Sequence, residues 1–191
     1  MTVAGPAGNV SGVIEGPRVR LRPVRDGDWS LLERWGSHRD GLWGPYQRFQ
    51  LDHVPQLKRA ASERGLLGRE FGLLLIETRS DERAVGFVRY TLSTFPDADC
   101  PCPDIGFGIA EPDARGQGLA AEATGLLVDY LFAGYPTERI TAVTETANAP
   151  ARRTLEKVGF TEEGTLRRAI FRDGEWRDLA LYGLLRSERP T

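Results

Sequence analysis

Apolar positions along the chain follow two different periods from residue 19 onward. Short alternating or continuous apolar runs predict strands, the first of which begins at Val19. The remaining predicted strands span residues 70–77, 84–94, 104–110, 139–145, 161–172 and 175–185. The last two are joined by Asp173 and Gly174, a dipeptide that favours a tight hairpin turn.

Four segments between these strands carry apolar residues at helical spacing. Asp26 and Asp52 can cap the first two predicted helices, and Gly159 ends the fourth. The residues that share one face of each helix are Trp29, Leu32 and Trp35, then Val54, Leu57 and Ala61, then Leu119, Ala123, Leu126, Leu127, Tyr130 and Leu131, and finally Ala151, Leu155 and Val158. The sequence shows no internal repeat and no second linker, so we expect one mixed α/β domain over residues 17–188.

The first sixteen residues differ from the rest of the chain. They are rich in Gly, Ala, Pro and Val, follow neither period, and predict a disordered tail over residues 1–16. They also contain no Lys or Arg and no apolar block, so they do not resemble a signal peptide. Because no apolar stretch approaches the roughly 20 residues of a membrane helix, we expect a cytoplasmic protein without a membrane partner.

Charge and cysteine content argue against two further classes of function. Twenty-five Lys and Arg against 27 Asp and Glu give a formal net charge of −2, which is not typical of a nucleic-acid-binding protein. Cys100 and Cys102 lie two positions apart, whereas the two histidines, His38 and His53, are distant in sequence. A structural zinc site needs four ligands, so we expect reduced thiols and no metal.

The segment from Asp104 to Ala123 carries the clearest chemical signal. A strand runs into a loop with Arg115, Gly116 and Gly118, and the loop opens into an amphipathic helix. The free N–H groups at a helix N-terminus bind phosphate, glycine allows close approach of the backbone, and arginine adds a cation. Neither a Walker loop nor a dinucleotide fingerprint matches these residues. The alternative interpretation is a glycine-rich turn that only reverses the chain.

Several motifs accompany this loop. Arg115, Gly118 and Ala120 fill R/Q-x-x-G-x-G/A, and the preceding strand fills I-G-[YF]-x-[IL] at Ile105 to Ile109. The motif N-x-x-[SA]-x-x-x-[LY]-E-K-x-G-F is matched by Asn148, Ala151, Leu155, Glu156, Lys157, Gly159 and Phe160. The closing hairpin matches D-G-x-[WY]-x-D-x-x-x-Y at Asp173, Gly174, Trp176, Asp178 and Tyr182. From about Val19 to Leu185, the chain therefore resembles the GNAT superfamily of N-acetyltransferases, in particular the ribosomal-protein alanine N-acetyltransferase branch.

This resemblance implies an α/β fold with a mixed, strongly twisted sheet and flanking helices, in which the fourth and fifth family strands splay apart. It implies that acetyl-CoA enters the gap and that its pantetheine arm pairs with the backbone of Phe107, Gly108 and Ile109. The pyrophosphate would lie on the loop and first helical turn formed by Arg115, Gly116, Gln117, Gly118, Leu119 and Ala120. Asn148 would contact the pantetheine, although it can equally cap the helix before Pro150.

The implied reaction is direct transfer of an acetyl group to a primary amine in a ternary complex. An amine of lysine type is almost entirely protonated at neutral pH, so a carboxylate that accepts its proton is useful. Asp104 at the start of the fourth family strand and Glu145 at the end of the fifth are the two candidate catalytic bases. Each can instead be a solvated carboxylate at a strand end.

The chain departs from the family at the positions of the leaving-group acid. Where relatives carry Tyr, Ser or Glu, this sequence has Leu155, Ala151 and Ile170. The acid is then another residue, such as Tyr182 or Tyr130, or water. The departure keeps open a non-catalytic acyl-CoA-binding module, and a larger acyl-CoA such as succinyl-CoA is a second alternative.

The aromatic stretch between the first two predicted helices is the candidate acceptor site. Its Trp43 and Tyr46, with Phe49 and His53 nearby, either line an acceptor cleft or form core beneath a long loop. The acceptor itself is expected to be a protein N-terminus or a small-molecule amine. Relatives often form dimers, so a homodimer is possible.

Overall fold

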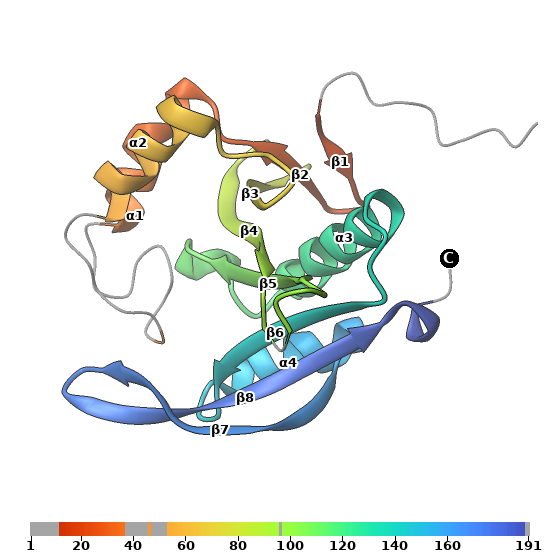
Figure 1. Ribbon diagram of the computed structural model, residues 1–191. Helices are drawn as coiled ribbons and strands as arrows, with labels where there is room; N and C mark the ends of the chain where they lie inside the picture. The colour runs from red at the N-terminus through yellow and green to blue at the C-terminus, as the bar shows by residue number, and fades with distance from the viewer. Residues whose placement is uncertain (1–11, 37–45, 47–52, 96, 190–191) are drawn as a thin grey trace, which may run out of the picture.

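An eight-stranded mixed sheet lies at the centre of the computed structural model, which describes residues 12–36, 46, 53–95 and 97–189 (Figure 1). The strand order is β1-β2-β3-β4-β5-β6-β8-β7, and all neighbouring strands are antiparallel except β5 and β6. The strands are β1 (Ile14–Glu15), β2 (Val19–Pro23), β3 (Phe71–Thr78), β4 (Ala84–Ser93), β5 (Cys102–Ile109), β6 (Arg139–Glu145), β7 (Thr161–Arg172) and β8 (Glu175–Leu185). The predicted mixed sheet is confirmed.

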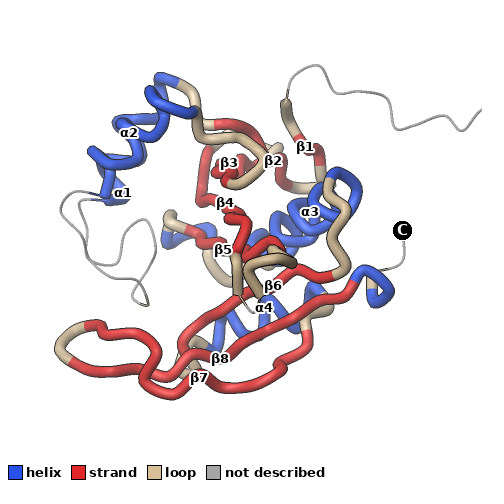
Figure 2. The backbone as a smooth tube through the Cα atoms, in the orientation of Figure 1, coloured by secondary structure: helices blue, strands red, loops and turns tan. Residues whose placement is uncertain are grey.

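Helices cover both faces of this sheet, as Figure 2 shows. The helices are α1 (Trp29–Gly36), α2 (His53–Arg64), α3 (Leu119–Gly134) and α4 (Ala149–Val158). On one face, Leu127 of α3 and Leu155 of α4 are buried in a core that includes Ile140 of β6. On the other face, Leu32 of α1 is buried with Phe87 of β4. Within the described ranges, no helix is long and apolar enough to cross a membrane.

The pairing of β5 changes halfway along the strand. β5 pairs with β4 from Cys102 to Ile109, but it pairs with β6 only at Asp104 and Ile105. β6 then continues to Glu145 as the neighbour of β8. β5 and β6 therefore diverge beyond Ile105, as the family resemblance implied. The gap that opens between them points toward the loop before α3.

One end of the predicted disordered tail is ordered. Ile14 and Glu15 form β1 and pair with Leu21 and Arg20 of β2. The turn between them is closed by the Gly16 amide, which donates to the carbonyl of Val19 at 2.9 Å. The prediction of disorder is wrong for these two residues. Two residues are too few to show an alternating pattern in the sequence, and they form a strand because they pair with the edge of β2. Residues 1–11 lie outside the described ranges.

The start of β5 also differs from the prediction. β5 begins at Cys102 rather than at Asp104, since Cys102 and Pro103 pair with Ser93 and Leu92 of β4. Asp104 consequently lies inside a strand and not at its end. The neighbouring strand, rather than the local Pro- and Asp-rich sequence, sets this boundary.

Candidate active site

The gap between β5 and β6 is lined by a bare strand edge. Beyond Ile105, the edge of β5 that faces away from β4 has no partner strand in the described part of the chain. Phe107, Gly108 and Ile109, the residues predicted to pair with pantetheine, lie on this edge. An extended edge offers alternating N–H and C=O groups to a ligand that carries amides. The pairing of these three residues with pantetheine stays a prediction.

The loop at the end of this gap contains two glycines in the left-handed conformation just before α3. Gly116 and Gly118 have φ values of +75° and +79°, a left-handed conformation that other residues adopt only with strain. Gly118 is the N-cap of the 16-residue helix α3, whose first N–H groups have no partner within the helix. Leu119 is buried and anchors the helix start, whereas Ala120 is partly exposed on the first turn.

Two side chains of this loop, Arg115 and Gln117, donate hydrogen bonds to backbone carbonyls close to them in sequence. Arg115 donates to the carbonyls of Ile109 and Ala110 at 3.0 and 3.1 Å, so its guanidinium fixes the end of β5. Gln117 donates from Nε2 to the carbonyl of Asp113 at 2.7 Å. Both residues therefore shape the loop, while the backbone presents the groups that can meet a ligand.

Two cations near Gly118 were not identified from the sequence as site residues. A Cβ placed on Gly118 would be 3.6 Å from both Nη2 of Arg18 and Nζ of Lys157. Arg18 also donates to the Gln117 carbonyl at 2.9 Å and pairs with Glu122 at 2.8 Å. Lys157 belongs to the E-K-x-G-F motif, which was a usable signal, whereas nothing in the sequence pointed to Arg18. Lys157 therefore adds a positive charge beside the loop, whereas the charge of Arg18 is balanced by Glu122.

Asp104 lies at the root of the gap, where β5 and β6 last pair. Thr141 of β6 donates to its Oδ2 at 3.5 Å, and Nη1 of Arg89 on β4 is 3.9 Å from Oδ1. A Cβ on Gly106 would be 2.9 Å from Nε of Arg89, so this glycine makes room for the arginine beside the carboxylate. Burial raises the pKa of the Asp104 carboxyl, although the charge of Arg89 and the hydrogen bond from Thr141 act in the opposite direction.

Glu145, the other candidate base, is engaged elsewhere. Arg172 of β7 donates from Nε to Oε1 at 2.6 Å and from Nη2 to Oε2 at 2.9 Å. The Glu145 side chain is 3% exposed and that of Arg172 is 11% exposed. Both carboxylate oxygens thus accept from a guanidinium that stays charged at any working pH. Asp104, by contrast, has no such bidentate bond to a guanidinium among the described residues.

The acceptor candidates are only partly described. Trp43 lies outside the described residues, and so does Phe49. Tyr46 is placed with its hydroxyl donating to the carbonyl of Ala147 at 3.2 Å, and its ring lies 5.7 Å from the guanidinium carbon of Arg172. Tyr46 is therefore close to the end of β6 and to the β7–β8 hairpin. Figure 1 shows this hairpin extending beneath α1 and α2.

The positions at which relatives carry the leaving-group acid hold apolar side chains in this chain. Leu155 is 1% exposed in the core with α3, and Ile170 is half-buried on β7. The hydroxyl of Tyr182 accepts from Nε of Arg152 at 3.1 Å, and burial raises its pKa. Tyr130 packs against other tyrosines near the C-terminal end of α3, far from the loop at its start. Neither tyrosine faces the Asp104 side of the sheet.

Asn148 is the N-cap of α4, as one of its two interpretations required. Its Oδ1 accepts from the amide of Ala151 at 3.2 Å, and its Nδ2 donates to Thr144 at 3.0 Å. The capping role is confirmed. A contact with the pantetheine stays a prediction.

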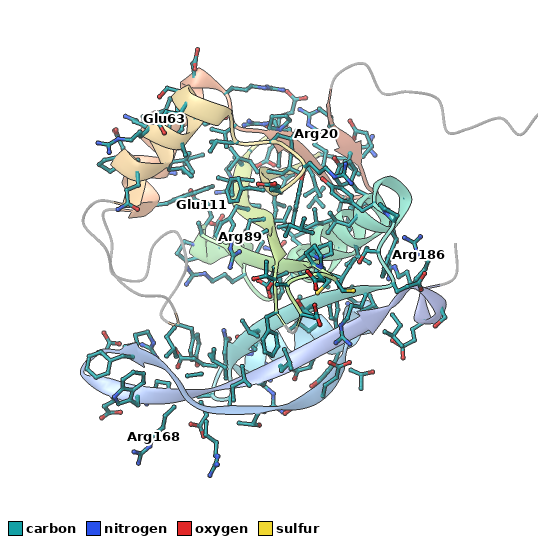
Figure 3. All side chains as sticks on the ribbon, viewed as in Figure 1. Arg20, Glu63, Arg89, Glu111, Arg168 and Arg186 are labelled. Atoms are coloured by element: carbon teal, nitrogen blue, oxygen red, sulfur yellow. The ribbon has the colours of Figure 1, made fainter. Side chains whose placement is uncertain are left out.

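Figure 3 shows Arg89 near the middle of the sheet, between the α1–α2 pair and the β7–β8 hairpin, while Arg168 lies on the outer side of that hairpin. Ile105, next to Asp104 on β5, is buried in the core with α3, so the side chain of Asp104 lies on the opposite face of the sheet, which α1 covers. The loop from Arg115 to Gly118 lies at the open end of the same gap. A ligand that follows the gap from the loop would reach this surface beside Asp104.

Comparisons with known proteins agree with this arrangement. The family described as "Acetyltransferase (GNAT) domain" matches residues 18–161. The SPbeta prophage-derived uncharacterized N-acetyltransferase YokL of Bacillus subtilis is 32% identical over 123 residues, which cover 62% of this chain and 64% of YokL. The chain spans between about half and two thirds of the length of the first curated relatives that it matches.

Solved structures match over most of the chain. RimJ of Mycobacterium smegmatis, solved with CoA-disulfide, is 28% identical with a TM-score of 0.72, and the match covers 94% of this chain and 89% of RimJ. A GNAT-family acetyltransferase from Bacillus anthracis has a TM-score of 0.73 at 22% identity and covers 91% of this chain and 98% of its own. Since the family match spans most of the sequence and the splayed sheet has the family's form, the chain belongs to the GNAT acetyltransferase family.

Proposed function

We propose that this protein is an N-acetyltransferase that transfers the acetyl group of acetyl-CoA to a primary amine, by direct attack in a ternary complex. One observation supports this most strongly. A bare strand edge leads from the N-terminus of α3 to a partly buried carboxylate, so a cofactor site and a proton acceptor lie in one continuous gap. The family membership and the CoA ligand of RimJ point the same way.

The residues present fit acetyl-CoA. The edge at Phe107, Gly108 and Ile109 suits the two amides of a pantetheine arm. The backbone from Arg115 to Ala120, with Arg18 and Lys157 beside Gly118, suits a pyrophosphate. When bound, acetyl-CoA supplies an acyl thioester that an amine can attack.

Asp104 is the residue that we assign to proton transfer. Only about one lysine-type amine in a few thousand is neutral at pH 7, whereas an α-amine with a pKa near 8 is neutral far more often. A carboxylate whose pKa is raised by burial is a stronger base than an ordinary aspartate, and a base works best when its pKa is near the working pH. Asp104 accepts the proton of the amine directly or through a water molecule.

Arg89 bears on the choice of acceptor. Its guanidinium lies across Gly106 and 3.9 Å from the carboxylate of Asp104. A guanidinium repels a second positive charge and donates to a carbonyl or carboxylate. We therefore favour an amine with a neighbouring carbonyl, as at a polypeptide N-terminus, over a polyamine such as the spermidine named for other family members. We place this reaction in the cytoplasm.

The test is release of free CoA from acetyl-CoA in the presence of an acceptor panel. An alanine-initiated peptide, spermidine and free lysine serve as acceptors, and succinyl-CoA replaces acetyl-CoA in a parallel series. We expect acceptor-dependent release with acetyl-CoA, and more with the peptide than with spermidine. Binding of CoA without release in any arm would instead identify a non-catalytic acyl-CoA-binding module. Faster turnover with succinyl-CoA would reassign the acyl group.

A further inference from the structure

The buried ion pair of Glu145 and Arg172 joins the end of β6 to the far end of the β7–β8 hairpin. The two residues are 27 positions apart in sequence and bonded through both carboxylate oxygens. Arg172 also pairs with Asp173 at 2.5 Å in the hairpin turn. A buried carboxylate that loses its guanidinium partner is left with an uncompensated charge, so the two side chains depend on each other.

Tyr46 extends this pair to a third part of the chain. Its ring lies 5.7 Å from the Arg172 guanidinium, within the range of a cation–π contact, and its hydroxyl bonds the Ala147 carbonyl just beyond β6. Tyr46 comes from between α1 and α2, so the cluster of Tyr46, Glu145 and Arg172 connects three segments around the open end of the β5–β6 gap. We call it the clamp.

A bulge in the hairpin precedes Arg172 on β7. The β7–β8 register shifts between Leu166 and Ile170, and Arg168 within the shift has a φ of +49°. The amide of Arg168 donates to Oδ1 of Asp178 at 2.7 Å, which holds this strained residue in place. Bulges bend a strand and redirect its side chains. Asp178 of the closing-hairpin motif therefore stabilises the bulge in β7, in addition to the turn that Asp173 and Gly174 form.

We propose that Tyr46, Glu145 and Arg172 are positioning residues that set the acceptor side of the active site, and that Glu145 does not transfer a proton. This inference rests on the N-acetyltransferase activity proposed above. The clamp fixes the hairpin and Tyr46 relative to the end of β6. Glu145 lies on the same face of β6 as Thr141, which bonds Asp104, so the clamp borders the face on which an acceptor meets Asp104. Loosening the clamp therefore weakens acceptor binding and leaves the cofactor loop unchanged, because the printed bonds of that loop go to β5, Asp113 and Arg18 and not to the clamp.

The experiment compares Glu145→Gln and Arg172→Gln with Glu175→Gln, a matched control at an exposed ion pair on the same hairpin. With the acceptor that the wild type uses best, peptide or spermidine, we expect both clamp variants to raise the acceptor KM at least tenfold. We expect the Kd for CoA to change less than twofold and the acid limb of the pH profile to stay in place. The double variant Glu145→Gln/Arg172→Gln should be no worse than the worse single variant, because the two groups act as one unit.

Variants of Tyr46 test the same inference if a Gln variant fails to fold. Tyr46→Leu removes the ring contact and should raise the acceptor KM, whereas Tyr46→Phe keeps the ring and should have a smaller effect. An unchanged acceptor KM in the folded clamp variants, with an active wild type, would overturn the inference and leave the acetyltransferase proposal intact. Loss of the acid limb in Glu145→Gln would also overturn it, by making Glu145 the base. A wild type that releases no CoA would refute the acetyltransferase proposal itself.

Discussion

Replacing Gly118 by aspartate tests the assignment of the cofactor loop. Gly118 caps α3 at a φ of +79°, and a Cβ there would be in ordinary contact range of Arg18 and Lys157, 3.6 Å from each charged nitrogen. The new side chain therefore fits in the available space. Its carboxylate would meet the two cations and the helix N-terminus, which are the same groups that we assign to the pyrophosphate.

The expected loss of affinity follows from these cations. Two unit charges 4 Å apart interact by about 1 kcal/mol in water and about 4 kcal/mol at an effective dielectric constant near 20. Arg18 is already paired with Glu122, whereas the described residues offer Lys157 no ion pair, so mainly one cation is neutralised. Adding repulsion between the carboxylate and a phosphate, we expect a loss of about 2–3 kcal/mol, which corresponds to CoA binding about 30- to 160-fold weaker.

Gly118→Asn is the matched control, because it has the same size and the same backbone strain without the charge. Both variants pay for the left-handed conformation, which asparagine and aspartate tolerate better than other residues. The aspartate is partly compensated by the helix dipole, so it should unfold no more easily than the asparagine variant. Calorimetry with CoA measures both. If Gly118→Asp bound CoA within threefold of Gly118→Asn, the loop would not be the phosphate site.

Three further variants test the base, the acid and the fold. Asp104→Asn should lower kcat about 10²- to 10⁴-fold with unchanged CoA affinity, and a normal kcat would refute the assignment. In the wild type, the acid limb of the pH profile of kcat/KM should lie above the usual aspartate range, because protonation at the raised pKa of Asp104 removes the base. Tyr182→Phe should lower kcat less than about tenfold, since its hydroxyl bonds Arg152 away from Asp104, and a thousandfold loss with intact CoA binding would make it the acid. Arg22→Ala should destabilise the fold by about 1.5–3 kcal/mol in urea titrations, because Arg22 is 5% exposed and joins the buried Glu77 to Asp28, while Glu77 keeps its pair with Arg20. A loss below about 0.5 kcal/mol would contradict this.

Local signals in the sequence predicted most elements of the fold. Asn148 caps α4 and Gly159 ends it in a left-handed conformation, as their residue types indicated. Asp173 and Gly174 both have positive φ values, as a tight hairpin turn of this composition requires. These features depend on residues close in sequence, and each has a backbone preference of its own. That is why a pattern along the chain was sufficient to find them.

The features that escaped prediction depend on residues far apart in sequence. Ile14 and Glu15 form a strand only because β2 offers an edge, and Cys102 is in β5 because β4 pairs with it. The bond between Glu145 and Arg172 joins β6 to β7 across 27 positions of sequence, and no local propensity indicates it. As a result, the sequence placed Glu145 and Asp104 in one class of candidate bases, and only the packing distinguishes a carboxylate held by arginine from one at the root of the gap.

The apolar acid positions have a consequence for how the proposed reaction is accelerated. Leu155 is part of the core, and Tyr182 has its hydroxyl bonded on the α4 side, so neither supplies a proton near Asp104. A thiol has an ordinary pKa near 8.5, so a thiolate leaves with little help near neutral pH and water can protonate it. Rate enhancement then comes chiefly from orienting the amine and from backbone N–H groups that meet developing negative charge. The extended edge of β5 supplies such groups. Asp104, which lies where β5 and β6 still pair, supplies the proton acceptor in the proposed reaction. A chain without a dedicated acid therefore still has the parts that direct transfer needs.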